Sequence, residues 1–295
     1  MAGAGNISLG SATLNINNTT STNYSGAISG TGGIIKSGAG TLTLEGASSY
    51  DGATLINAGV LAITNANALG STSQGTTVSS SGAALELNLT GSTVVAEAIA
   101  LNNATLRSNT DALLTGALTL SGSNQISTNN SGNVLTLNGA INGASNLTLA
   151  GPGSIILGGM IGGSTQLSSL TSNAANTTIA NDIKTTGSQT YNNAVTLGAS
   201  SALSISGTGN LIFAAGINGG GNTLTVTSGN SGNTLALVNS VDQTWNLNSA
   251  NTGNVSGAVT NGNLNFSGFG NLTGGAANDT FAFADGASVS GIVEG

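Results

Sequence analysis

The chain has 295 residues and a formal net charge of −7, yet only 4% of its residues are charged, 3% are aromatic, and glycine fills 47 positions. It contains neither histidine nor cysteine, which excludes a histidine-dependent catalytic triad, a thiol nucleophile, a disulfide framework and the usual zinc sites. Because its Lys and Arg residues number three, it also lacks the basic surface of a nucleic-acid-binding protein and a polybasic membrane anchor.

Short segments in which an apolar residue alternates with a small polar one recur from the start of the chain to its end. Most of them finish at Gly, Asn or Ser, which accept the backbone of a tight corner. Such segments lie at residues 12–16, 41–46, 83–89, 117–122, 134–139, 146–151 and 222–229. Since successive side chains of a strand point to opposite faces, this alternation predicts β-strands with one buried face. Helical spacing is broken throughout by Gly, Asn and β-branched residues.

Strands this short are typical of two all-β architectures. A sandwich or barrel fills a core about 10 Å thick with large side chains, and five Phe, three Tyr and one Trp are too few for this. A parallel β-helix instead stacks small aliphatic residues inside and Thr, Ser and Asn outside. The scarcity of charge favours it, because a charge repeated in each coil would lie about 4.8 Å from its copies. The sequence therefore predicts an all-β parallel β-helix (β-solenoid) with coils of about 20 residues.

Residues 24–70 resemble the passenger-associated transport repeat of bacterial autotransporter proteins. The resemblance rests on "SGAISGTGG", on Lys36 and Ser37 before "GAGTLTL", on Tyr50 before "DGAT", and on "INAGVLAITNANALG". More loosely, residues 189–226 and the C-terminal residues from 264 onward are similar to units of filamentous-haemagglutinin-like surface proteins.

The resemblance implies a right-handed parallel β-helix that is exported through an outer membrane and displayed outside the bacterial cell. We expect one solenoid segment over residues 1–295, with the repeat at 24–70, irregular coils at 71–262, and a truncated haemagglutinin-like unit at 263–295. The sequence shows no secretory signal and no stretch of about 18 apolar residues. Export signals are therefore expected outside this sequence, and no membrane insertion of this segment is expected.

A non-enzymatic stalk or adhesin segment, acting in adhesion or in an extracellular matrix without a cofactor, is the function that this interpretation favours. The expected partner is a glycan or protein on a host or neighbouring cell, or a second copy of the chain. One alternative is an extracellular filament formed by end-to-end stacking of solenoids. Another is a polysaccharide-active β-helix enzyme, for which Glu45 and Asp51, on either side of a corner, would be the paired acids.

Two further features are candidates for binding. Residues 274–282, "GGAANDTFA", are similar to the calcium-binding nonapeptide G-G-x-G-x-D-x-U-x, which makes Asn278 and Asp279 candidate calcium ligands. Ala277 stands where that motif has Gly, so a structural corner is the alternative for this segment. Trp245, the single Trp, is a candidate contact for a sugar or protein if it is exposed, and a core residue otherwise.

Overall fold

Short parallel β-strands make up the regular structure of the protein. The computed structural model describes residues 1–90 and 93–295, and over these ranges it contains strands and no α-helix. Two compact units are formed: unit 1 contains residues 1–141 and 150–154, and unit 2 contains residues 142–149 and 155–295. Within each unit, a strand pairs in parallel with the equivalent strand of the next coil. The predicted all-β parallel β-solenoid is therefore confirmed.

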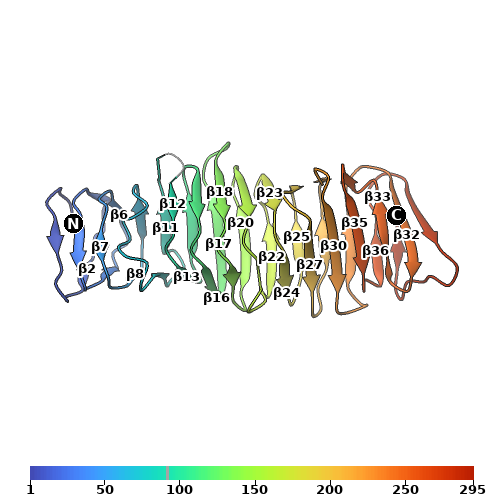
Figure 1. Ribbon diagram of the computed structural model, residues 1–295, viewed down its shortest axis with the longest axis horizontal. Helices are drawn as coiled ribbons and strands as arrows, with labels where there is room; N and C mark the ends of the chain where they lie inside the picture. The colour runs from blue at the N-terminus through green and yellow to red at the C-terminus, as the bar shows by residue number, and fades with distance from the viewer. Residues whose placement is uncertain (91–92) are drawn as a thin grey trace. The chain divides into compact units, whose positions relative to one another are not determined.

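Unit 1 stacks its strands in chain order, as the blue to green part of Figure 1 shows. Sheet I contains β3 (Thr22–Tyr24), β6 (Thr41–Leu44), β9 (Val60–Ile63), β11 (Ala84–Leu87), β14 (Thr105–Ser108) and β17 (Ser123–Thr128). Sheet II contains β2 (Leu14–Ile16), β5 (Ile34–Lys36), β8 (Thr54–Ile56), β10 (Thr76–Val78), β13 (Ile99–Asn102) and β16 (Leu118–Ser121). Two smaller stacks contain β1 (Ile7–Ser8), β4 (Ile28–Gly30) and β7 (Ser49–Tyr50), and β12 (Val94–Val95), β15 (Ala112–Leu114) and β18 (Val134–Leu137).

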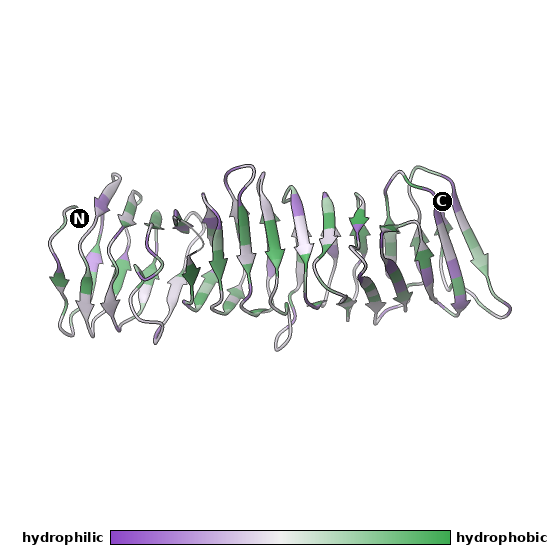
Figure 2. Cartoon of the chain, turned by 45° about the horizontal axis from the view of Figure 1, so that its top comes forward, coloured by the Kyte–Doolittle hydropathy of each residue, from purple (hydrophilic) through white to green (hydrophobic). Residues whose placement is uncertain are grey.

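The core of unit 1 is built from columns of apolar side chains, one from each coil. On the inner side of sheet I, the column is Leu42, Leu61, Leu85, Leu106 and Ile126, all in register and all fully buried. Its members are 19 to 24 residues apart, which agrees with the expected coil length. Each such side chain contributes roughly 1.5–3 kcal/mol when it is removed from water. Figure 2 shows the resulting alternation of apolar and polar segments along the strands.

Some corners bring the backbones of successive coils into direct contact. A Cβ atom on Gly116 would lie 1.8 Å from the carbonyl oxygen of Glu97, and one on Gly139 would lie 1.9 Å from that of Gly116. We therefore expect Gly116→Ala to lower the free energy of unfolding by about 2 kcal/mol or more, because the coils would have to separate. Urea unfolding measures the loss. Gly5→Ala, where a Cβ meets nothing within 4 Å, is the control in the same unit, and an equal effect of both changes would contradict the prediction.

Unit 2 follows the same plan with three sheets. Sheet III contains β22 (Ser169–Ser172), β25 (Gln189–Tyr191), β28 (Leu211–Phe213), β31 (Thr234–Leu237), β36 (Asn271–Thr273) and β38 (Val293–Glu294). Sheet IV contains β23 (Asn176–Ile179), β26 (Ala194–Leu197), β29 (Ile217–Asn218) and β34 (Val259–Thr260). Sheet V contains, in spatial order, β24 (Ile183–Thr185), β27 (Ser201–Ile205), β30 (Thr223–Ser228), β35 (Asn263–Ser267), β33 (Thr252–Ser256), β32 (Gln243–Ser249) and β37 (Asp279–Phe283). The chain passes between the units at β19 (Ile141–Asn142), β20 (Asn146–Ala150) and β21 (Ser154–Leu157).

One part of sheet V departs from the uniform parallel coil that the sequence predicts. The strands β32 and β33 form an antiparallel hairpin, and β33 also pairs antiparallel with β35. Asn251, which has a φ of 53°, lies in the connection of this hairpin, and asparagine is one of the few residues that tolerate this backbone. The hairpin inserts two strands between β35 and β37 and so provides the setting for Trp245.

None of the described residues belongs to a helix with the length and hydropathy of a membrane span. The boundaries expected at residues 24–70, 71–262 and 263–295 stay a prediction.

Candidate functional site

Lys36, at the end of β5, lies inside the solenoid. Its side chain is 0% exposed, and its Nζ donates hydrogen bonds to the carbonyl oxygens of Gly38 and Ala58, the latter at 3.1 Å. Gly38 belongs to the corner after β5, and Ala58 to the equivalent corner one coil later. Burial lowers the pKa of the Lys36 ammonium. The ammonium therefore joins two successive corners within the stretch that resembles the passenger repeat.

A second buried polar group, which sequence reasoning missed, lies where this stretch continues into the next coils. Tyr50 and Thr54 share a hydrogen bond of 2.5 Å between their hydroxyl oxygens. Thr54 pairs with Thr76 of the next coil, and the Thr76 hydroxyl donates to Glu97 Oε1 at 3.1 Å. Glu97 is only 3% exposed, and burial raises the pKa of its carboxyl to about 7. Burial likewise raises the pKa of the Tyr50 phenol, and the Glu97 charge adds to this effect.

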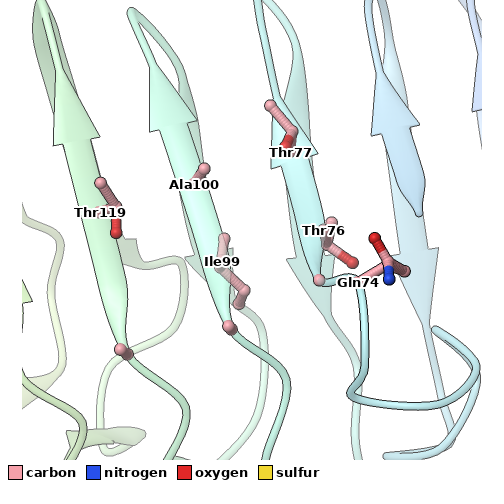
Figure 3. A pocket seen from close by; sticks show the side chains of 9 residues that line it. Gln74, Thr76, Thr77, Ile99, Ala100 and Thr119 are labelled. Carbon is pink, nitrogen blue, oxygen red and sulfur yellow. The ribbon is translucent and has the colours of Figure 1, made fainter.

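A shallow hollow lies beside this group on the outer side of sheet II. It has a volume of about 150 Å³, and its lining includes Gln74 and Thr76. Figure 3 shows Thr77, Ala100 and Thr119 following one another across neighbouring strands at this place, in agreement with their register. The volume is below the roughly 300 Å³ at which small-molecule pockets begin, so this hollow offers no enclosed substrate site.

Of the two candidate calcium ligands, Asp279 is the first residue of β37 and Asn278 comes directly before it. The Asp279 carboxylate accepts hydrogen bonds from the backbone N–H of Gly275 at 2.8 Å and of Gln243 at 3.2 Å. The backbone N–H of Asn278 donates to Asp242 Oδ1 at 3.1 Å. Among the described residues, no group of three or more His, Cys, Asp or Glu side chains could hold a metal ion. This geometry is that of a corner held together by carboxylates, and calcium binding by Asn278 and Asp279 stays a prediction.

Trp245, in β32, packs inside the C-terminal part of unit 2. It is 0% exposed, and its indole ring lies 5.8 Å from the ring of Phe266 and 5.5 Å from that of Phe281. These aromatic contacts give it the core role, so it offers no face to a ligand in this structure. Of the two roles considered for Trp245, its burial agrees with the core residue, and a contact role stays a prediction. The strand that carries it pairs with β33 on one edge and with β37 on the other, and no sequence pattern indicated that hairpin.

We expect Trp245→Ala to lower the free energy of unfolding by roughly 3–5 kcal/mol, because a large cavity would remain between Phe266 and Phe281. Chemical unfolding followed by circular dichroism measures the loss. In the unaltered protein, fluorescence of this single Trp should be blue-shifted relative to the unfolded chain and protected from iodide. Efficient quenching by iodide in the native state would show that the side chain is exposed.

The acids proposed for a polysaccharide-active enzyme do not form an evident catalytic pair. Glu45 Oε1 accepts a hydrogen bond from Asn23 Nδ2 at 3.1 Å, and Asp51 is exposed at the start of a corner. Another acid of unit 1, Glu86, forms an ion pair with Arg107, with 2.6 Å between Glu86 Oε2 and Arg107 Nε. These contacts are those of a solvated outer face, where single ion pairs contribute little.

Comparisons with known proteins agree with the resemblance seen in the sequence. The family model of the passenger-associated transport repeat matches residues 34–63, the part of the chain that holds Lys36, Tyr50 and Thr54. The Adhesin BmaC autotransporter of Brucella suis biovar 1 (strain 1330) is 55% identical over 60 residues, which are 19% of this chain and 2% of that relative. No solved structure matches the chain.

The match thus covers a small part of a very long relative. Within this chain, the residues matched by the family model lie in the coils whose corners are joined by Lys36. The repeat model and the autotransporter relative together show that this part of the chain is similar to an autotransporter passenger.

Proposed function

We propose that the chain is a non-catalytic stalk and adhesin segment, which acts in adhesion or in the extracellular matrix. The observation that carries this proposal is the stack of parallel coils whose outer faces bear small neutral side chains. In sheet III, for example, Thr171 and Thr190 lie in register on the outer side. Such a stack holds distant parts of a long protein away from the cell, and its repeated surface makes many weak contacts. Weak contacts add up through multivalency.

Beads coated with the purified chain test the adhesive part of this proposal. The beads should adhere to epithelial cells or to matrix-coated glass with a steep dependence on coating density, because several coils must bind at once. Beads coated with an unrelated β-solenoid of similar charge are the control. Adhesion no greater than that of the control beads at any density would contradict the adhesive role.

Self-association into filaments is the second candidate. The observation that favours it is β37, which is the last strand of sheet V and carries Phe283 with 47% of its surface exposed. An open strand edge can pair with another chain. Sedimentation velocity over a concentration series should then show growing species, and Phe283→Lys should suppress them. A monomer at every concentration would exclude this candidate.

A further inference from the structure

Unit 2 has a polar hollow at the place where its antiparallel hairpin joins the parallel coils. The hollow has a volume of about 350 Å³ and lies between β33 and β35. Its polar lining comes from Asn254 and Ser256 on β33 and from Asn263 and Asn265 on β35. Asn254 and Asn265 are directly paired across the two strands, so their side chains stand next to each other on the outer side of sheet V.

A second hollow of about 420 Å³ lies on sheet IV, over β26, β29 and β34. Thr196, Asn218 and Thr260, which form one register row, line it. The two hollows lie on either side of the turn between β34 and β35, since Asn261 lines the second and the next residue, Gly262, lines the first. We call the two hollows together the corner groove.

Two amide groups of the corner groove are free to bind a ligand, whereas Asn254 Oδ1 accepts from Asn246 Nδ2 and Asn218 Oδ1 accepts from the backbone N–H of Gly220. Asn263 and Asn265 are exposed, and their side chains hydrogen-bond to no other residue that the structure describes. The asparagine ladder of unit 1 is different, because Asn109 Nδ2 donates to Asn88 Oδ1 at 2.6 Å and Asn129 Nδ2 donates to Asn109 Oδ1 at 2.5 Å. That ladder uses its amides to hold coils together, whereas Asn263 and Asn265 keep donors and acceptors for another molecule.

The chemistry of the lining defines the class of ligand. An asparagine amide offers two N–H donors and a carbonyl acceptor, and a Ser or Thr hydroxyl donates and accepts. The lining residues of both hollows are all uncharged. A sugar hydroxyl also donates and accepts, so a row of neutral amides and hydroxyls matches an uncharged oligosaccharide. We propose that the corner groove binds neutral glycans, an inference that rests on the proposed adhesin function and names its ligand class.

The charge balance of the chain favours neutral over acidic sugars. The chain as a whole carries a net charge of −7. An acidic sugar would meet this negative potential without a basic side chain in the lining to offset it.

Saturation-transfer NMR of the full chain tests the proposal with maltotriose, cellotriose and chitotriose as probes. At least one of these neutral trisaccharides should bind with a dissociation constant in the millimolar range, and digalacturonate should bind more weakly. The double variant Asn263→Ala/Asn265→Ala should weaken the binding about tenfold or more. The matched control is Asn15→Ala, at an exposed asparagine of β2 in unit 1, which should leave it unchanged. No binding of any neutral probe, or equal binding by the double variant, would overturn the proposal.

The coated beads separate this inference from the function on which it rests. Beads that adhere although the chain binds no trisaccharide would leave the adhesin function standing and remove the corner groove as its site. If the trisaccharides bind at Asn263 and Asn265 but the beads do not adhere, the groove stands as a glycan site and the adhesive function falls. Circular dichroism of the double variant checks that the fold is intact.

Discussion

Replacing Glu97 with glutamine should raise the free energy of unfolding by about 3 kcal/mol at about pH 8.5, and change it little at about pH 4. Burial raises the pKa of this carboxyl from 4.5 to about 7 in the folded protein, and each unit of that shift is equivalent to about 1.4 kcal/mol. Glutamine keeps an acceptor for the Thr76 hydroxyl and cannot ionise. Urea unfolding of both proteins across this pH range measures the difference.

The sign follows from which state binds the proton more tightly. Between pH 4.5 and about 7, the folded protein still holds the Glu97 proton while the unfolded chain has released it. The stability contributed by the protonated carboxyl is therefore complete below about pH 4.5 and falls as the pH rises toward 7. Above that pH, the folded protein carries an ionised carboxylate near Tyr50 and Thr76, and no ion pair among the described residues offsets it.

Glu45→Gln is the control for the removal of one negative charge, because Glu45 is half-buried on the outer side of the same unit and accepts only from Asn23. The difference in free energy of unfolding between the Glu97 variant and the unaltered protein should grow with pH. The corresponding difference for the Glu45 variant should not show this growth. A stability difference for Glu97→Gln that is constant with pH, or that falls as the pH rises, would contradict a raised pKa at this position.

Much of the fold follows from local sequence. The segment "TLTL" places Leu42 and Leu44 on one face, and "VLAI" does the same with Leu61 and Ile63, so the strands and their buried faces follow from alternation. The stacking of Leu42 on Leu61 follows because parallel strands paired in register place equivalent inner residues next to one another. The passenger repeat was recognisable for a different reason, namely the order and spacing of its motifs around Lys36.

The polar interior was harder to predict, because polarity usually indicates exposure. The alternation in "IIK" places Ile34 inside, Ile35 outside and Lys36 inside. The alternation thus indicates that Lys36 is buried, whereas a rule based on residue type would place a lysine at the surface. Glu97 had no comparable signal, since its carboxyl accepts a hydrogen bond from Thr76, which lies 21 residues earlier in the chain.

The hairpin β32–β33 and the corner groove depend on long-range pairing. β33 pairs with β32 and with β35 on its two sides, and the residues between β33 and β35 also supply β34 to another sheet. Local alternation in this part of the chain is compatible with a parallel coil and with a hairpin. The choice between them therefore depends on partners distant in the chain, such as Phe266 and Phe281 around Trp245, and not on the pattern of any single strand.

Lys36→Ala should lower the free energy of unfolding by about 4 kcal/mol, the second large effect that we expect. The change removes a buried stem, which leaves a cavity between Ile16 and Ile56, the register partners of Lys36. It also leaves the carbonyl oxygens of Gly38 and Ala58 without the donor that now satisfies them, and an unsatisfied buried acceptor costs about 1–3 kcal/mol. Chemical unfolding at neutral pH measures the loss.

Lys36→Met separates packing from charge. Methionine refills most of the cavity and removes the cost of burying a cation. The free energy of unfolding should therefore fall by only about 1–2 kcal/mol, despite the unpaired carbonyls. Burial lowers the pKa of Lys36 in the folded state, and the unfolded chain therefore binds the proton more tightly between that lowered value and 10.5. In this window Lys36 makes stability rise with pH, and the Met variant should lack that rise. A Met variant as unstable as the Ala variant would show that the ammonium bonds, and not the packing of the stem, hold these corners together.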